Sequence, residues 1–107
     1  MADTPAQLMD PPTCLSAHPD SILACAAPVT RAIDLPWLAA EHQVVERTGV
    51  GFIDPTYWVC PTSPCPVVIG HVLLYQNAGH LSTTFAASLT DRLDQAVAQQ
   101  MAATPAP

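Results

Sequence analysis

The chain has 107 residues, the size of one small domain, and half of them are hydrophobic while 11% are charged, which excludes a disordered acidic tail. Nine acidic residues stand against three basic ones, a formal net charge of −6, so nucleic acid is not an expected partner because little could neutralise its phosphates. No apolar run approaches the roughly 18 residues of a transmembrane helix, and the opening MADTPAQLMDPP lacks the basic and apolar regions of a signal peptide.

The first 30 residues are rich in proline, aspartate, serine and alanine, and their turn signals predict an irregular surface segment. Proximity in the sequence predicts a disulfide between Cys14 and Cys25, one of three possible connectivities for four cysteines. Closing that loop is expected to stabilise the fold by about 2–3 kcal/mol. His18 lies inside the loop and is expected to be an exposed turn residue.

A helix is predicted from Leu35 to Thr48. Asp34 can cap its free N–H groups, and Gly49 supplies the stop. His42 is expected on its solvated face. The apolar residues gather on the other side at helical spacing: Trp37, Leu38, Val44 and Val45.

Residues 50–53 are predicted to form a short buried strand, because a strand that follows a helix through a glycine turn is typical of an α/β sheet. Asp54 would stand at the carboxyl end of that strand, where open α/β sheets place their sites. The alternative role for Asp54 is an Asx turn onto Thr56 or Tyr57. Tyr57 and Trp58 are expected to add aromatic area to the core.

The second half of the chain begins with a close cysteine pair, Cys60 and Cys65, which is predicted to form the other disulfide. Residues 67–75 read as two short strands folded about Gly70 and His71. A two-residue turn with glycine first indicates a type II′ hairpin, with His71 at its tip.

The last predicted element is an amphipathic helix capped by Ser82 or Thr83, with a tail that frays from Thr104. Apolar residues recur every four positions along it, and this stripe is expected to pack on the core: Leu81, Phe85, Leu89, Leu93, Val97 and Met101.

Two kinds of chemistry are disfavoured by the cysteines. A zinc site from Cys60, Cys65, His71 and His80 is unexpected because its last two candidates flank an apolar strand. A nucleophilic Cys–His pair is unexpected because two disulfides leave no free thiol. We therefore expect no metal and no cofactor.

Two readings of His80 stay open on the residues alone. His80 can be the base of a serine-hydrolase triad, with Asn77, three positions earlier, accepting its second N–H and fixing its tautomer. Equally, His80 can simply be a helix-capping residue of a structural domain.

The motifs DPTYWVC, PC and PVVIGHVLLYQNAGHLSTTFAASLTDRL resemble the end of the SGNH-hydrolase-like domain fused to acyltransferase-3-type membrane proteins. That family has a D-P-T-x-W-x-C segment, a second cysteine, a P-V-V-x-G hairpin, and a D-x-x-H-L-T motif that opens the final helix. The resemblance covers nearly the whole chain, since it extends upstream over Asp3-Thr4-Pro5, Cys14, the H-P-D around His18, Cys25 and the helix that ends at Gly49.

The resemblance implies part of a three-layer α/β (flavodoxin-like) fold on the extracytoplasmic side of the cell membrane. There the domain would work with a multi-spanning acyltransferase domain to acylate envelope carbohydrate. The family's catalytic histidine falls on His80 and its aspartate partner on Asn77. In a serine-protease triad, Asp→Asn costs on the order of 10⁴-fold in rate. Ser82 stands where the family has threonine.

The family's nucleophile lies in a Gly-Asp-Ser block, and its oxyanion donors lie in intermediate blocks; none of these is present. No serine of the chain is therefore assigned as the nucleophile (Ser16, Ser21, Ser63, Ser82 and Ser88). We expect residues 1–107 to be the C-terminal portion of one SGNH-like domain, with residues 1–30 as the disulfide-tied segment and 31–107 as helix, strand, hairpin and terminal helix. Such a chain would fold poorly and be inactive alone. The alternative is a non-catalytic, disulfide-stapled interaction or remnant protein.

Overall fold

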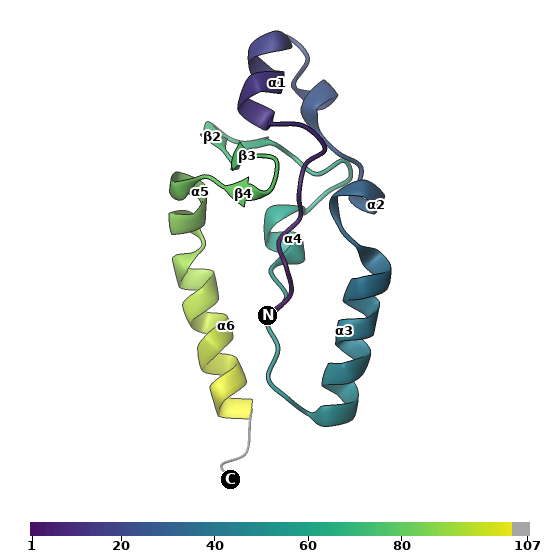
Figure 1. The fold of residues 1–107 in the computed structure, drawn as a ribbon. Helices are drawn as coiled ribbons and strands as arrows, with labels where there is room; N and C mark the ends of the chain where they lie inside the picture. Colours follow the sequence, from purple (N-terminus) through teal and green to yellow (C-terminus); the bar gives the residue numbers. More distant parts are fainter. Residues whose placement is uncertain (104–107) are drawn as a thin grey trace.

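The computed structural model describes residues 1–103, so the predicted fraying from Thr104 lies outside the described residues. The molecule is elongated, with extents of 54 × 28 × 18 Å. Helices α1, η1, α2 and α4 and four short strands form a head, from which the two long helices α3 and α6 extend in the same direction (Figure 1). In chain order the elements are α1 Pro11–Ala17, η1 Ile22–Cys25, α2 Val29–Ala32, α3 Leu35–Thr48, α4 Thr56–Val59, β1 Val68–Ile69, β2 Val72–Leu73, β3 Tyr75–Asn77, β4 His80–Leu81, α5 Thr83–Ser88 and α6 Thr90–Ala103.

The strands form two antiparallel pairs, β1 with β2 and β3 with β4, so the chain is mixed α/β. The predicted first hairpin is confirmed at its turn, with Ile69 opposite Val72. Its second strand is shorter than predicted, because β2 ends at Leu73 and Tyr75 begins β3. Gly70, at its turn, has φ 62°, and no non-glycine residue among those described has positive φ. His71 therefore has negative φ, as the second position of a type II′ turn requires. His71 is exposed at the tip, as predicted.

The predicted strand at residues 50–53 is wrong. These residues belong to no strand pair, and Val50 is exposed. The Ile53 carbonyl accepts a hydrogen bond from the Ala2 N–H at 2.8 Å, and the Phe52 N–H donates to the Gln100 side chain at 3.0 Å. A strand requires a neighbour along its whole length, and Ala2 supplies one bond of such a ladder.

Helix α3 has the predicted bounds and the predicted ends. The Asp34 side chain accepts a hydrogen bond from the Trp37 N–H at 3.0 Å, and Gly49 closes the helix in the left-handed conformation with φ 69°. Its apolar side is only partly covered, however. Leu38 packs against the buried residues around the Cys60–Cys65 disulfide, whereas Trp37 is 64% exposed and Val44 is 47% exposed.

The final helix begins as predicted at the Ser82 cap, whose hydroxyl accepts from the Phe85 N–H at 3.2 Å. It is broken at Leu89 into α5 and α6. The predicted core packing of its stripe holds for the first part only, since Phe85 is buried and Leu89 packs against the core. The stripe beyond the break is open to solvent, which corrects the prediction for Leu93, Val97 and Met101.

Both predicted disulfides are confirmed, Cys14–Cys25 and Cys60–Cys65. Each lies in its own cluster of buried residues. The larger cluster surrounds the first disulfide and contains Cys14, Cys25, Val59, Val67, Leu74, Tyr75 and Phe85. The smaller surrounds the second and contains Ala27, Ala32, Ile33, Cys60 and Cys65.

Two further predictions are corrected by this packing. The first 30 residues are not an irregular surface segment, since they contain α1, η1 and part of α2, and they supply buried residues to both clusters. Tyr57 adds nothing to the core because it is 57% exposed. Trp58 is half-buried and lies under the Arg92 guanidinium, with 5.3 Å from the guanidinium carbon to the ring centroid.

A buried glutamine joins segments that are distant in the sequence. The Gln7 N–H donates to the Ala78 carbonyl at 2.8 Å, and its side-chain oxygen accepts from the Ala27 N–H at 2.8 Å. Its side-chain nitrogen donates to the Cys65 carbonyl at 3.4 Å. Gln7 is 5% exposed, so these bonds satisfy backbone groups that water cannot easily reach.

No single helix in residues 1–103 is long and apolar enough to cross a membrane. One pair of helical segments bent by 46°, Ile22–Ala32 with Leu35–Thr48, has the length and composition to do so together, a property shared by buried core helices and signal sequences.

Candidate functional site

The second hairpin brings Asn77 and His80 together at its turn. These residues end β3 and begin β4 and lie opposite each other in the register. The His80 Nδ1 lies 2.9 Å from the Asn77 side-chain oxygen, which also accepts the Gly79 N–H at 3.0 Å. A backbone N–H can only donate, so the atom facing it is the amide oxygen. Nδ1 of His80 therefore carries the proton, which leaves the lone pair on Nε2.

The hairpin is held in place from both sides. Tyr75, at the start of β3, is completely buried, and Leu81, after His80, packs against the same cluster. The Ser82 N–H donates to the Leu74 carbonyl at 2.7 Å, and the Ser82 hydroxyl donates to the Leu73 carbonyl. Ser82 therefore connects the end of β4 to β2 while it caps α5.

This geometry excludes one of the two readings of His80. The helix-capping reading is wrong, because His80 lies in β4 and Ser82 is the cap of α5. The imidazole is exposed and Asn77 is partly buried, so Nε2 is accessible to a group that approaches from outside. The pair can accept a proton at Nε2 while Asn77 holds the tautomer, but the neutral amide offers no charge to an imidazolium.

No serine of the described chain is placed to be the nucleophile of this pair. None of the five serine hydroxyls in residues 1–103 is bonded to His80. Four of them are bonded to backbone groups: Ser16, Ser63, Ser82 and Ser88.

A second histidine, His42 on α3, pairs with a carboxylate, that of Asp54. The His42 Nε2–H donates to the Asp54 carboxylate at 3.1 Å, and the His42 ring packs edge-on against Phe52. The other carboxylate oxygen accepts the Thr56 N–H at 3.0 Å, which confirms the predicted Asx turn. His42 is exposed as predicted, but its contact with Asp54 was missed, because it depends on the chain turning back at Gly49.

Burial of Asp54 raises its pKa, but the hydrogen bonds from Thr56 and His42 outweigh this, so the pKa of the folded carboxyl lies below its ordinary value of 3.8. A carboxylate with a lowered pKa stabilises the fold above its unfolded pKa, and that contribution is lost as the pH falls through the folded value. With His42 half exposed, the pair is expected to be worth about 1 kcal/mol or less.

We therefore expect Asp54→Asn to lower the free energy of unfolding near neutral pH and to flatten its fall below pH 3.8. Urea denaturation at a series of pH values measures both. The matched control is Asp20→Asn, a change at an exposed loop acid. Equal pH profiles for wild type and Asp54→Asn would contradict this account.

The disfavoured zinc site at Cys60, Cys65, His71 and His80 is not formed, because its two sulfurs are bonded to each other. All four cysteines are in disulfides, so the chain in this form offers no thiolate to a Cys–His pair.

Comparison with known proteins decides the family. Residues 3–95 match the family described as SGNH domain (fused to AT3 domains). The chain belongs to this SGNH family. The match includes both disulfides, the His80–Asn77 pair and the first turns of α6. The family's fusion to AT3 domains supports the expected multi-spanning acyltransferase partner domain. No curated protein and no solved structure matches the chain.

Proposed function

We propose that this SGNH chain is the base-bearing, C-terminal portion of the extracytoplasmic domain of an envelope O-acyltransferase. The reaction is transfer or hydrolysis of an acyl ester on cell-surface carbohydrate. The observation that carries the proposal is the His80–Asn77 hydrogen bond, which lies in the family's terminal motif and leaves Nε2 free to act as a base.

In the proposed reaction the nucleophile is a serine from the rest of the domain. His80 Nε2 takes the proton of that hydroxyl as its oxygen attacks the acyl carbonyl, and it returns the proton to the departing group. A sugar hydroxyl, deprotonated in the same way, then takes the acyl group; water in its place gives hydrolysis. Asn77 keeps the proton on Nδ1 throughout and so keeps Nε2 basic.

The apolar surfaces of the long helices support the proposed remainder of the domain. A groove of about 480 Å³ along α3 is lined by Trp37, Val44 and Phe52, and one of about 300 Å³ along α6 by Trp58, Leu89 and Leu93. In a three-layer α/β fold the helices cover the faces of a central sheet. We propose that the sheet of the complete domain occupies both grooves and gives residues 50–53 their missing neighbours.

We expect the isolated 107-residue chain to be inactive because it lacks the Gly-Asp-Ser block. A fluorophosphonate probe should label no serine, and chromogenic acetate esters should be hydrolysed no faster than by a His80→Ala variant. Serine labelling together with ester turnover by this polypeptide alone would overturn the proposal.

The competing function is a non-catalytic, disulfide-stapled interaction or remnant protein. An amide at the position of the family's aspartate favours it, since Asn77 weakens the base. The coding DNA upstream of Met1 distinguishes the two. A continuous frame with a Gly-Asp-Ser block and a series of apolar spans supports the acyltransferase, and a stop codon without such a frame supports the remnant.

A further inference from the structure

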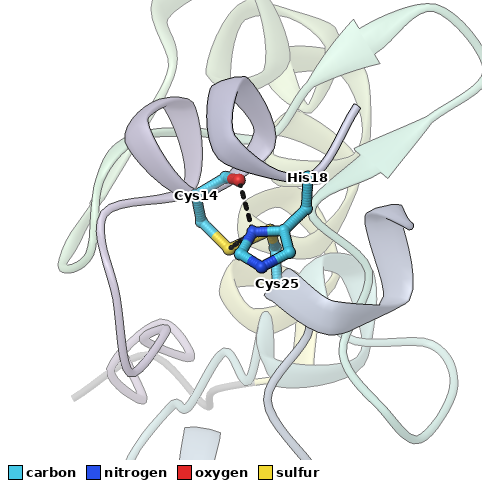
Figure 2. Close-up of side chains that lie close together, drawn as sticks. All are labelled: Cys14, His18 and Cys25. Atoms are coloured by element: carbon cyan, nitrogen blue, oxygen red, sulfur yellow. Dashed lines mark hydrogen bonds between the residues drawn. A yellow bond between two sulfur atoms is a disulfide. The ribbon is translucent and has the colours of Figure 1, made fainter. Parts of the chain in front are cut away.

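The first disulfide has a histidine beside it that the acyl-transfer site does not use. Figure 2 shows the His18 imidazole next to the Cys14 sulfur, with Nδ1 directed at the Cys14 carbonyl oxygen. The ligand atoms of Cys14, His18 and Cys25 all lie within 4.8 Å of one another. Cys14 and His18 are four residues apart at the end of α1, so they share one helix face, and Cys25 ends η1.

The local hydrogen bonding prepares His18 to bind a cation. Its Nδ1 lies 3.0 Å from the Cys14 carbonyl oxygen, which can only accept, so Nδ1 carries the proton and Nε2 carries the lone pair. Metal-binding histidines usually donate their second N–H to a carbonyl or carboxylate in this way. His18 is exposed, so an ion can reach the ring from solvent.

We propose that reduction of the Cys14–Cys25 disulfide turns this cluster into a three-ligand site for Zn²⁺. A dithiol reductant supplies two electrons and two protons, becomes a disulfide itself, and leaves two thiols on the protein. Binding of Zn²⁺ then displaces both thiol protons to solvent, so each ion is held by two thiolates and one neutral imidazole. The reduced protein therefore binds the ion and the oxidised protein does not. This site does not depend on the proposed acyl transfer.

The positions of the donors suit this ion. Tetrahedral Zn²⁺, with Zn–S about 2.3 Å and Zn–N about 2.0 Å, holds its ligand atoms about 3.5–3.8 Å apart. The His18 ring lies beside the Cys14 sulfur, with its protonated Nδ1 3.8 Å away, so side-chain rotation has to move the ligand atom Nε2 only a short way to reach this separation. The Cα atoms of Cys14 and Cys25 are 5.8 Å apart, and side-chain rotation alone can therefore separate the sulfurs. The fourth position remains for water.

The second disulfide lacks this arrangement and serves as an internal control. The Cys60 sulfur lies 3.1 Å from the Thr62 carbonyl. Within residues 1–103 the grouping of three ligand side chains includes neither Cys60 nor Cys65. Reduction is therefore expected to create a zinc site at Cys14 and Cys25 but none at Cys60 and Cys65.

The test is a Co²⁺ titration of the full chain after anaerobic reduction with a phosphine and removal of the reductant. We expect one equivalent to bind with thiolate-to-cobalt charge-transfer absorption, displaced by Zn²⁺, and no absorption with the oxidised protein. His18→Ala should weaken binding by at least the roughly tenfold that loss of an outer-shell partner costs. The matched control, His71→Ala, changes an exposed turn histidine and should leave affinity unchanged.

Two double variants test whether the ion binds to cysteine thiols of an unfolded chain. Circular dichroism follows the fold of each variant. Cys60→Ser/Cys65→Ser should keep the absorption and the affinity, and Cys14→Ser/Cys25→Ser should lose both. Absence of the absorption from the reduced wild type, or equal losses in the two double variants, would overturn the proposal. Retained affinity in His18→Ala would overturn the histidine's part in it.

Discussion

If the proposed function holds, Asn77→Asp in the complete proposed acyltransferase is expected to raise the rate of acyl-enzyme formation by as much as on the order of 10⁴-fold, the reverse of the loss that Asp→Asn causes in a serine-protease triad. The Asn77 oxygen already lies 2.9 Å from His80 Nδ1 and accepts the Gly79 N–H. A carboxylate can accept both bonds and adds a charge that stabilises the imidazolium. The rate is measured by stopped flow as the release of the leaving group from a chromogenic ester by the protein expressed from the full reading frame.

Two controls separate charge from orientation. Asn77→Ala removes the acceptor and should lower the rate below that of wild type. His80→Ala should lower the rate by on the order of 10⁶-fold in the Asn77→Asp background and by about 10²-fold in the wild type, where the missing carboxylate has already cost most of that loss. If Asn77→Asp leaves the rate unchanged while His80→Ala abolishes it, Asn77 is not the orienting partner. If His80→Ala retains activity, His80 is not the base.

Loss of the Cys14–Cys25 disulfide is expected to be the most damaging change to stability. In the chain-entropy account, a separation of 11 residues corresponds to about 3 kcal/mol and one of 5 residues to about 2 kcal/mol. Each serine pair would bury two hydroxyls, because all four cysteines are buried. The expected difference of about 1 kcal/mol between the two variants therefore comes from loop length.

Urea denaturation followed by circular dichroism compares this variant with Cys60→Ser/Cys65→Ser as the matched pair. Stabilities of small domains are about 5–15 kcal/mol, so a loss of about 3 kcal/mol or more shifts the midpoint clearly. If Cys60→Ser/Cys65→Ser were equally or more destabilised, loop length would not be the governing factor.

The parts of the fold that were predictable from the sequence depend on residues close in the chain. The caps at Asp34, Gly49 and Ser82 work through neighbours within four residues. The two disulfides and the hairpin at Gly70 are similarly local. The family and its mixed α/β class also followed, because the terminal motif is compact and distinctive.

The predictions that were wrong concern elements whose structure depends on contacts with residues distant in the sequence. A run such as residues 50–53 has strand composition, but it becomes a strand only where a neighbour pairs with it. The stripe of the last helix has core composition, yet beyond Leu89 nothing in the described chain covers it. Within the site, Asn77 and His80 were predictable as a pair three residues apart. The His42–Asp54 contact was not, since a turn between them sets it.

The bonds of Gln7 determine how the base-bearing hairpin opens. Ala78 lies in the turn between Asn77 and His80, and its carbonyl is held by the Gln7 N–H, while the Gln7 side chain holds Ala27 and Cys65. Segments that share buried bonds tend to open together as one cooperative unit. We therefore expect the turn between Asn77 and His80 to open together with the segments around Ala27 and Cys65, rather than by itself.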